Sequence, residues 1–171
     1  MARRSLELLG FTDLAVGDEW ESPGRTVTEA DVASFAALTG DFNPLHVDHQ
    51  AARRGVFRRP IAHGLLGLSF AAGLTSAAPR VDTLAFLGLL EWTFSKPIFF
   101  GDTIRILSRV EALEPRSNGR RGVVTWRRRV VNQEGATVQE GRTQTLVRSR
   151  ISTTTSTDDA KPGGDEGPPP A

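Results

Sequence analysis

The second half of the chain alternates between apolar and polar positions, as β-strands do. Four aliphatic residues of the segment DTIRILSRVEALE share one face, with Ser108 among them: Ile104, Ile106, Val110 and Ala112. The segments VVTWRRRVVNQ and TVQEGRTQTLVRS follow, after turn signals at Asn118-Gly119 and Glu134-Gly135. Another apolar and aromatic strand precedes them in LAFLGLLEWTFSKPIF. Consecutive strands with short turns predict an antiparallel sheet.

The first half of the chain favours helices. TEADVASFAALTG has Thr28 as an N-cap and Gly40 as a stop, with apolar residues at roughly helical spacing between them. The longest uncharged run, IAHGLLGLSFAAGLTSAAP, covers residues 61–79 and is apolar on nearly every helical face, which predicts a helix buried on most sides. Small helices, one central apolar helix and then an antiparallel sheet form an α+β layout.

Composition and charge narrow the classes of protein. The chain has 171 residues, enough for one domain with a real core, and a net charge of +1. That charge gives no global field for nucleic acid or an acidic membrane. Cysteine is absent, which excludes disulfides and thiolate chemistry. The run 61–79 is too diluted by Gly, Ser, Thr and His for a membrane span of roughly 20 apolar residues.

The composition of the two ends of the chain bears on its location and on its domain bounds. Glu7 and Asp13 interrupt the short apolar pieces near the start, so we expect no signal peptide and a cytoplasmic location. Residues 152–171 contain no large apolar side chain and are rich in Thr, Gly, Pro and acid. Such a segment cannot bury enough surface to offset its ordering entropy. We therefore expect one domain over residues 1–151 and a disordered tail over 152–171.

The segment GDFNPLHVDH, residues 40–49, concentrates the candidate chemistry. It holds two of the three histidines of the chain, and Asp41 and His46 lie five residues apart. A carboxylate and an imidazole can share general acid–base work on one water, and Pro44 limits how the loop moves. A polar surface turn with unconnected side chains is the alternative, and this spacing alone leaves it open.

A metal site is a second alternative for these histidines. His46 and His49, with His63 from elsewhere, could donate three nitrogens. His46 and His49 face one another only in a helical segment, and Pro44 lies just before them. The spacing also matches no known ligand pattern. We therefore predict no metal and no other cofactor.

His63-Gly64 begins the apolar run, just after Pro60. Free N–H groups and the helix dipole at such a start suit a developing oxyanion, and a glycine lets a ligand approach them. A packing glycine beside a capping histidine is the alternative. The arginines of RRGVFRRP and RRGVVTWRRR could meet cofactor phosphates, although exposed surface arginines are the commoner explanation. Strand alternation separates Arg128 from its neighbours, and without a coherent basic face we expect no nucleic-acid partner.

Taken together, three motifs resemble the MaoC-like (R)-specific enoyl-CoA hydratase family of hot-dog proteins. They are GDFNPLHVD, AHGLLGLSF and FSKPIFFGDTI, and the resemblance covers roughly residues 25–147. The first motif is the most specific, whereas the stretch from Lys96 to Thr103 supports the fold more than the chemistry. The resemblance implies a long helix wrapped by a curved antiparallel sheet, in units that pair as a homodimer or larger homo-oligomer.

The resemblance also implies roles for individual residues. Asp41 and His46 would be the catalytic pair that holds and activates water, and the Gly64 N–H would bind the thioester carbonyl. Asn43 would orient the active loop, and His63 would support the start of the helix. Ala72 stands where simpler family members carry a serine near the substrate, and Ser69 lies one turn earlier.

The implied reaction is reversible hydration of trans-2-enoyl thioesters to (R)-3-hydroxyacyl thioesters, on coenzyme A or acyl carrier protein. A non-catalytic acyl-binding hot-dog subunit is one alternative, but its expected sign is loss of the Asp or the His. A hot-dog thioesterase is another, but that chemistry usually places a carboxylate on the central helix. Residues 61–79 contain no Asp or Glu. The carrier, the acyl chain length and the pathway are not determined by the sequence.

Overall fold

The computed structural model describes residues 7–150 of the chain. The predicted tail over 152–171 lies outside these residues, as does the predicted domain boundary at residue 151. Within them, none of the helices is long and apolar enough to cross a membrane.

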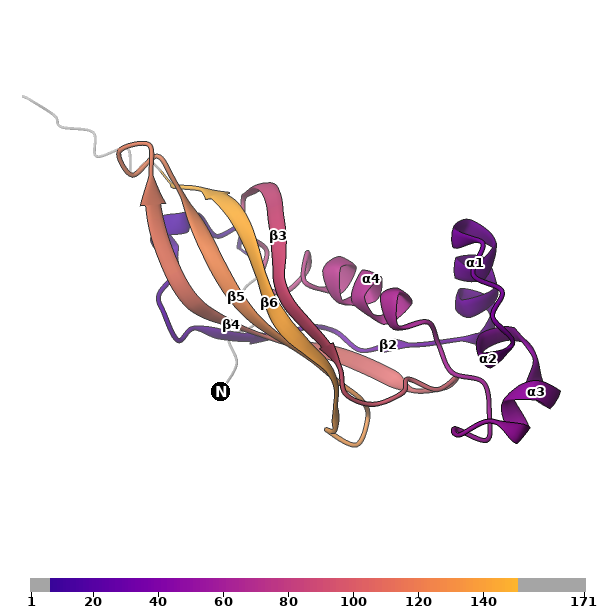
Figure 1. Ribbon diagram of the computed structural model, residues 1–171. Helices are drawn as coiled ribbons and strands as arrows, with labels where there is room; N and C mark the ends of the chain where they lie inside the picture. Colours follow the sequence, from indigo (N-terminus) through magenta and orange to yellow (C-terminus); the bar gives the residue numbers. More distant parts are fainter. Residues whose placement is uncertain (1–6, 151–171) are drawn as a thin grey trace, which may run out of the picture.

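The core of the fold is a curved antiparallel sheet (Figure 1). Its strands lie in the order β1-β4-β5-β6-β3, and β2 pairs with β4 beside this path. Every strand pair is antiparallel, so the predicted antiparallel sheet and the α+β layout are confirmed. The strands are β1 (Glu19–Glu21), β2 (Arg25–Thr26), β3 (Thr83–Phe94), β4 (Thr103–Arg116), β5 (Arg121–Val131) and β6 (Thr137–Arg148).

The strands bury the faces that their sequences predict. Ile104, Ile106, Ser108 and Val110 of β4 are all at most 1% exposed. Ala112 is only half-buried, because a register shift between Val110 and Ala112 ends the regular alternation there. The two predicted turns are also present, with positive φ at Asn118, Gly119 and Gly135.

Four α-helices and one short 3-10 helix complete the described chain. They are η1 (Phe11–Asp13), α1 (Glu29–Thr39), α2 (Pro44–Val47), α3 (His49–Arg54) and α4 (Gly64–Leu74). Thr28 caps α1 as predicted, because its hydroxyl accepts from the Asp31 N–H at 3.2 Å. Burial opposes ionisation of Asp31, but hydrogen bonds from Thr28 and Arg25 prevail and lower its pKa. Gly40 ends α1 in the left-handed region with φ of 78°.

Helix α4 lies against the sheet, and helices α1 to α3 gather beyond its N-terminal end (Figure 1). Leu66, Gly67 and Ala71 are its buried residues, and they form one face. A Cβ on Gly67 would lie 2.3 Å from Nε2 of Gln139, so only glycine allows the helix to approach the sheet this closely.

The prediction that this helix is buried on most sides is wrong for the single chain. Leu65 is 59% exposed, and Ser69, Ala72 and Gly73 are exposed as well. The neighbouring strand β3 also exposes six large apolar side chains: Leu84, Phe86, Leu87, Leu89, Leu90 and Phe94. One sheet covers only one side of a helix, so the other apolar side of α4 has no cover within residues 7–150.

Candidate active site

The segment around Asp41 folds into a turn followed by a single helical turn. The Asn43 side chain accepts from the Leu45 N–H at 2.9 Å and so caps α2. Pro44 is the first residue of α2, where a missing N–H costs nothing. The Asp41 carboxylate accepts from the Asn43 N–H at 3.2 Å, which fixes its position beside the helix. Asn43 therefore orders both sides of this loop through its backbone and its side chain.

His46 projects from α2 toward the segment that leads into α4. Its Nδ1 lies 2.8 Å from the backbone carbonyl oxygen of Ile61. A carbonyl oxygen only accepts, so Nδ1 donates and carries the proton in this bond. In the neutral ring, Nε2 then retains its lone pair, which is the form that a general base requires.

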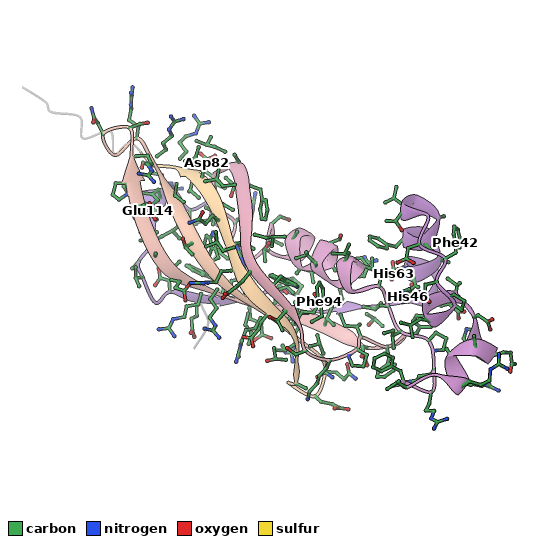
Figure 2. The ribbon with its side chains drawn as sticks, viewed as in Figure 1. Phe42, His46, His63, Asp82, Phe94 and Glu114 are labelled. Carbon is green, nitrogen blue, oxygen red and sulfur yellow. The ribbon has the colours of Figure 1, made fainter. Side chains whose placement is uncertain are left out.

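His63 connects the two groups of the GDFNPLHVDH segment. It is 2% exposed, and its Nε2 donates to the backbone carbonyl of Asp41 at 2.9 Å. Its ring stacks on that of His46, with centroids 3.9 Å apart, in the space between α2 and the start of α4 (Figure 2). Nδ1 of His63 is buried and has no hydrogen-bond partner within residues 7–150. Because His63 directly precedes Gly64, these contacts connect the Asp41 loop and the His46 ring to the start of α4.

Gly64 is the first residue of α4 and has an exposed backbone. No acceptor for its N–H occurs among the described residues, and His63 provides no side-chain cap. A Cβ at Gly64 would lie 2.9 Å from the Phe94 ring, so a larger residue would crowd this position. The amide of Gly64 is thus a free donor at the positive end of the helix.

Gln139 of β6 is a residue of this site that the sequence did not reveal. It is 2% exposed; its Nε2 donates to the Gly64 carbonyl at 3.0 Å, and its Oε1 accepts from Trp92 Nε1 at 3.1 Å. These bonds tie the first turn of α4 to strands β6 and β3. A glutamine in an alternating strand carries no sequence signal for such a contact, because its partners lie far away along the chain.

The three-histidine metal site that the sequence left as an alternative, His46, His49 and His63, does not assemble. His49 lies in α3, with its Nε2 2.8 Å from the Glu29 carboxylate. A different trio comes together, since Asp41, His46 and His63 have possible ligand atoms within 4.8 Å of one another. One nitrogen of each of these histidines already hydrogen-bonds a backbone carbonyl, which leaves one nitrogen on each ring as a possible ligand.

The geometry therefore excludes an unconnected surface turn. Asp41, His46, His63 and Gly64 come together at one place, the N-terminal end of α4. This arrangement presents a carboxylate, the Nε2 of an imidazole and a free backbone donor side by side. It can move protons on and off a bound water and stabilise a negative oxygen next to it.

Comparison with curated proteins identifies relatives of this chain. The chain is 37% identical to the (R)-specific enoyl-CoA hydratase of Aeromonas caviae over 112 residues, which cover 66% of the chain and 80% of that protein. It is 32% identical to the (R)-specific enoyl-CoA hydratase of Rhodospirillum rubrum, over 88% of the chain and 99% of that protein. It is also 38% identical to Protein MaoC of Klebsiella aerogenes, but spans only 29% of that longer protein.

Solved structures and a family model agree with these relatives. The MaoC-like dehydratase from Rhodospirillum rubrum superposes with a TM-score of 0.74 at 28% identity, over 84% of this chain and 99% of that one. A double hot-dog protein of Mycobacterium tuberculosis, 23% identical, superposes with a TM-score of 0.73 over 93% of this chain and 48% of that one, which confirms the hot-dog fold. The model of the MaoC like domain matches residues 13–133. The chain therefore belongs to the MaoC-like domain family.

Proposed function

We propose that this protein catalyses the reversible hydration of trans-2-enoyl thioesters to (R)-3-hydroxyacyl thioesters. The observation that carries the proposal is the meeting of Asp41, His46 and the Gly64 N–H at the start of α4. Hydration of a conjugated thioester needs a base for water, an acid for carbon 2 and a donor for the thioester oxygen. These three residues offer those functions without a metal or a nucleotide.

The proposed reaction begins with a water held by Asp41 and His46. Its oxygen forms a bond to carbon 3 as the π electrons of the C2–C3 bond move toward the thioester carbonyl. Negative charge develops on the carbonyl oxygen, which accepts a hydrogen bond from the Gly64 N–H. One proton leaves the water for the acid–base pair, and one proton arrives at carbon 2. The sum is addition of one water across the double bond, and the reverse sequence is dehydration.

The surrounding contacts support these roles. The bond from His46 Nδ1 to the Ile61 carbonyl orients the ring and leaves Nε2 to exchange protons. Asn43 holds the Asp41 carboxylate through its N–H, and His63 holds the Asp41 backbone through Nε2. Asn43 and His63 are therefore proposed as positioning residues. The hydroxyl of Ser69 donates to the Leu65 carbonyl within α4, so Ser69 receives no role in the proposal.

The names of the relatives support the same substrate class. They include (R)-specific enoyl-CoA hydratases and a 3-hydroxyacyl-[acyl-carrier-protein] dehydratase of Arabidopsis thaliana mitochondria. Both carriers therefore stay within the proposal. A thioesterase reaction receives less support, because the carboxylate of this site lies on a loop and α4 carries no acid. A cytoplasmic location stays a prediction.

We also propose that two copies pair through β3. This strand is twelve residues long, and within residues 7–150 it pairs only with β6, which leaves its other edge open. Two of its exposed side chains lie next to α4: the Phe94 ring lies beside Gly64, and Phe86 borders a cavity with Leu68 and Ala72. An unpaired apolar edge of this length invites another strand, and a second copy would cover the strand and the helix together.

The decisive experiment measures hydration of a short trans-2-enoyl-CoA and its acyl-carrier-protein counterpart by the purified protein, with the product resolved as the (R) or (S) isomer. Asp41→Asn and His46→Gln keep side-chain size but remove acid–base capacity, and each should lower kcat by roughly 10²–10⁴. The double variant should be little worse than either single one, because the two residues act on one water.

His49→Gln is the matched control, since His49 lies in the same stretch but pairs with Glu29 away from the cluster. It should retain most activity. Absence of turnover on both carriers, or full activity in folded Asp41→Asn, would overturn the proposed reaction. In the first case the acyl-binding subunit becomes the better interpretation.

A further inference from the structure

One strand of the sheet buries a cation. Arg128 of β5 is 7% exposed, whereas Arg127 and Arg129 on either side are exposed, as strand alternation predicts. Removal from water lowers the pKa of Arg128 to about 9, which still leaves the guanidinium positively charged at neutral pH. A permanent charge therefore lies on the inner side of the sheet.

Arg128 has no acid partner within residues 7–150. Its Nη1 donates to the Ser108 hydroxyl, and its Cζ lies 4.5 Å from the centroid of the Trp126 ring. Exposed arginines of the same sheet do have partners, such as Arg127, which contacts Glu140 at 3.2 Å. A guanidinium has five N–H donors, and a buried cation without a counter-charge is costly. The charge therefore lies where a negatively charged group would be strongly favoured.

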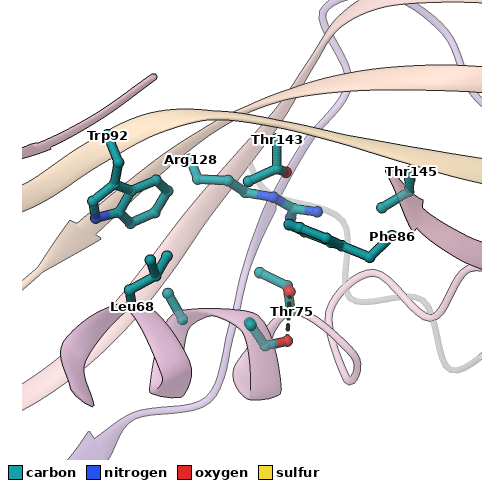
Figure 3. Close-up of a pocket in the computed structure, with 9 residues that line it drawn as sticks. Leu68, Thr75, Phe86, Trp92, Arg128, Thr143 and Thr145 are labelled. Carbon is teal, nitrogen blue, oxygen red and sulfur yellow. Dashed lines mark hydrogen bonds between the residues drawn. The ribbon is translucent and has the colours of Figure 1, made fainter. Parts of the chain in front are cut away.

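Arg128 borders a cavity of about 70 Å³ between α4 and the sheet. Figure 3 shows its side chain extending between Trp92 and Phe86, above the helical turn that carries Thr75. Leu68 and Ala72 of α4 contribute apolar walls, while Thr143 and Thr145 add hydroxyl groups. A second hollow of about 220 Å³ shares Arg128, Phe86 and Ala72 with the first. The guanidinium thus borders a mostly apolar space that is large enough for part of an acyl chain.

The same helix connects this cavity to the proposed active site. Gly64 begins α4, Leu68 lies about one turn later, and Ala72 about two turns later. At 1.5 Å of rise per residue, Gly64 and Ala72 are about 12 Å apart along the helix axis. Because C–C bonds measure about 1.5 Å and zigzag, an extended acyl chain of roughly eight to ten carbons spans this distance. A thioester carbonyl at Gly64 would then place the far end of the chain near Arg128.

We infer that Arg128 is a specificity-determining residue that binds a carboxylate at the far end of the acyl chain. The substrates that it favours are ω-carboxy-2-enoyl thioesters rather than thioesters that end in a methyl group. The guanidinium would donate two parallel N–H bonds to the carboxylate, and the threonine hydroxyls could donate to it as well. This inference rests on the proposed function for the position of the thioester, but the cavity and the unpaired cation are independent of the reaction.

The test compares matched ligands that cannot react. Octanedioyl-CoA and octanoyl-CoA, together with their six- and ten-carbon analogues, lack the double bond, so calorimetry measures their binding without turnover. At the best-fitting length, the wild-type protein should bind the carboxylated ligand about 10- to 100-fold more tightly than its methyl-ended partner, the scale of charge-assisted hydrogen bonds. Arg128→Met should abolish this ratio, and Arg128→Lys should retain part of it. Arg129→Met, on the opposite face of the same strand, should leave it unchanged.

Three outcomes would overturn the inference. The first is that the wild-type protein binds the carboxylated ligand no more tightly than its methyl-ended partner at every chain length; this outcome needs no variant. Persistence of the preference in Arg128→Met would assign it to another residue. Dissociation of an assembly by Arg128→Met, with the ligand ratio intact, would make Arg128 the partner of an acid in a second copy. A carboxylate preference in a protein that hydrates no enoyl thioester would instead reject the proposed function and retain this inference.

Discussion

The imidazole rings of His46 and His63 stack with their centroids 3.9 Å apart and their planes inclined by 29°. His63 also holds the Asp41 backbone carbonyl at 2.9 Å through its Nε2. One buried side chain therefore sets the plane of the His46 ring and the position of the loop that carries Asp41. The two contacts use different parts of His63, the ring face and the ring N–H, so they can be removed separately.

Substitution of His63 should distinguish these two contacts. His63→Phe keeps a flat ring against His46 but loses the bond to Asp41, whereas His63→Gln keeps a donor but loses the ring. Each should lower kcat by roughly tenfold to a hundredfold with little change in KM, because misplacement of a catalytic group by about 1 Å has effects of that order.

The pH profile of kcat checks that interpretation. A positioning role leaves two titrating steps in the profile of each folded variant, because Asp41 and His46 remain. Loss of one step in His63→Phe would instead make His63 itself a proton-transfer group, contrary to its proposed role.

The Gly64 N–H can be tested without the crowding that any Cβ would cause at Phe94. We compare Gly64→Pro with Gly64→Ala, both in a Phe94→Leu background that makes room for the added Cβ. The alanine variant keeps the N–H, and proline is tolerated at the first helical position. The proline variant should be roughly 10²- to 10³-fold slower in kcat than the alanine variant. Equal rates in the two folded variants would place the thioester oxygen elsewhere.

The open edge of β3 predicts a self-association that charge should abolish. The double variant Leu87→Glu/Leu89→Glu would bring four carboxylates together in a dimer paired through β3, so sedimentation should change from a dimer to a monomer at micromolar concentration. Val56→Glu is the control, because Val56 is 90% exposed in the turn that follows α3, outside strand β3, and its substitution should leave the assembly intact. A wild-type protein that sediments as a monomer would reject the proposed pairing.

The buried charge of Arg128 should lower the free energy of unfolding, although the same charge serves the proposed ligand binding. Arg128→Met replaces a buried cation by an apolar side chain of similar length, and the free energy of unfolding at pH 7 should rise by about 1–4 kcal/mol. Chemical denaturation measures this difference, and Arg129→Met should change it little. A large loss of stability in Arg128→Met would show instead that Arg128 is a structural group satisfied by its contacts with Ser108 and Trp126.

The difference in free energy of unfolding between Arg128→Met and the wild-type protein should change with pH in a definite direction. Removal from water lowers the pKa of Arg128 in the folded protein to about 9, well below its ordinary value. Below pH 9 both the folded and the unfolded states carry the proton, so the full penalty of burial is present. Between these two values the unfolded state binds more protons, and the stability of the wild-type protein rises with pH. The advantage of Arg128→Met should therefore shrink from pH 7 to pH 10.

Local patterns in the sequence determined the elements and the motif of this protein. Alternation on β4 placed Ile104 and Ile106 inside, Thr28 and Gly40 bounded α1, and Asn118-Gly119 made a turn, because each signal depends on neighbours only a few residues away. The same alternation separated Arg128 from Arg127 and Arg129. The motif around Asp41 and His46 was also visible, since both residues lie in one short segment.

Contacts between distant segments were decided by the tertiary structure alone. His63 meets the Asp41 loop across 22 positions, and Gln139 meets Gly64 across 75, so no local pattern could reveal either bond. Whether both apolar sides of α4 are covered depends on the number of layers that pack against it. The apolar run alone cannot specify that number. Burial of Arg128 without an acid depends on the three-dimensional arrangement, since none of the carboxylates in residues 7–150 pairs with it in the small volume between α4 and the sheet. Linear order does not fix such distances, because they arise only when the sheet curves around the helix.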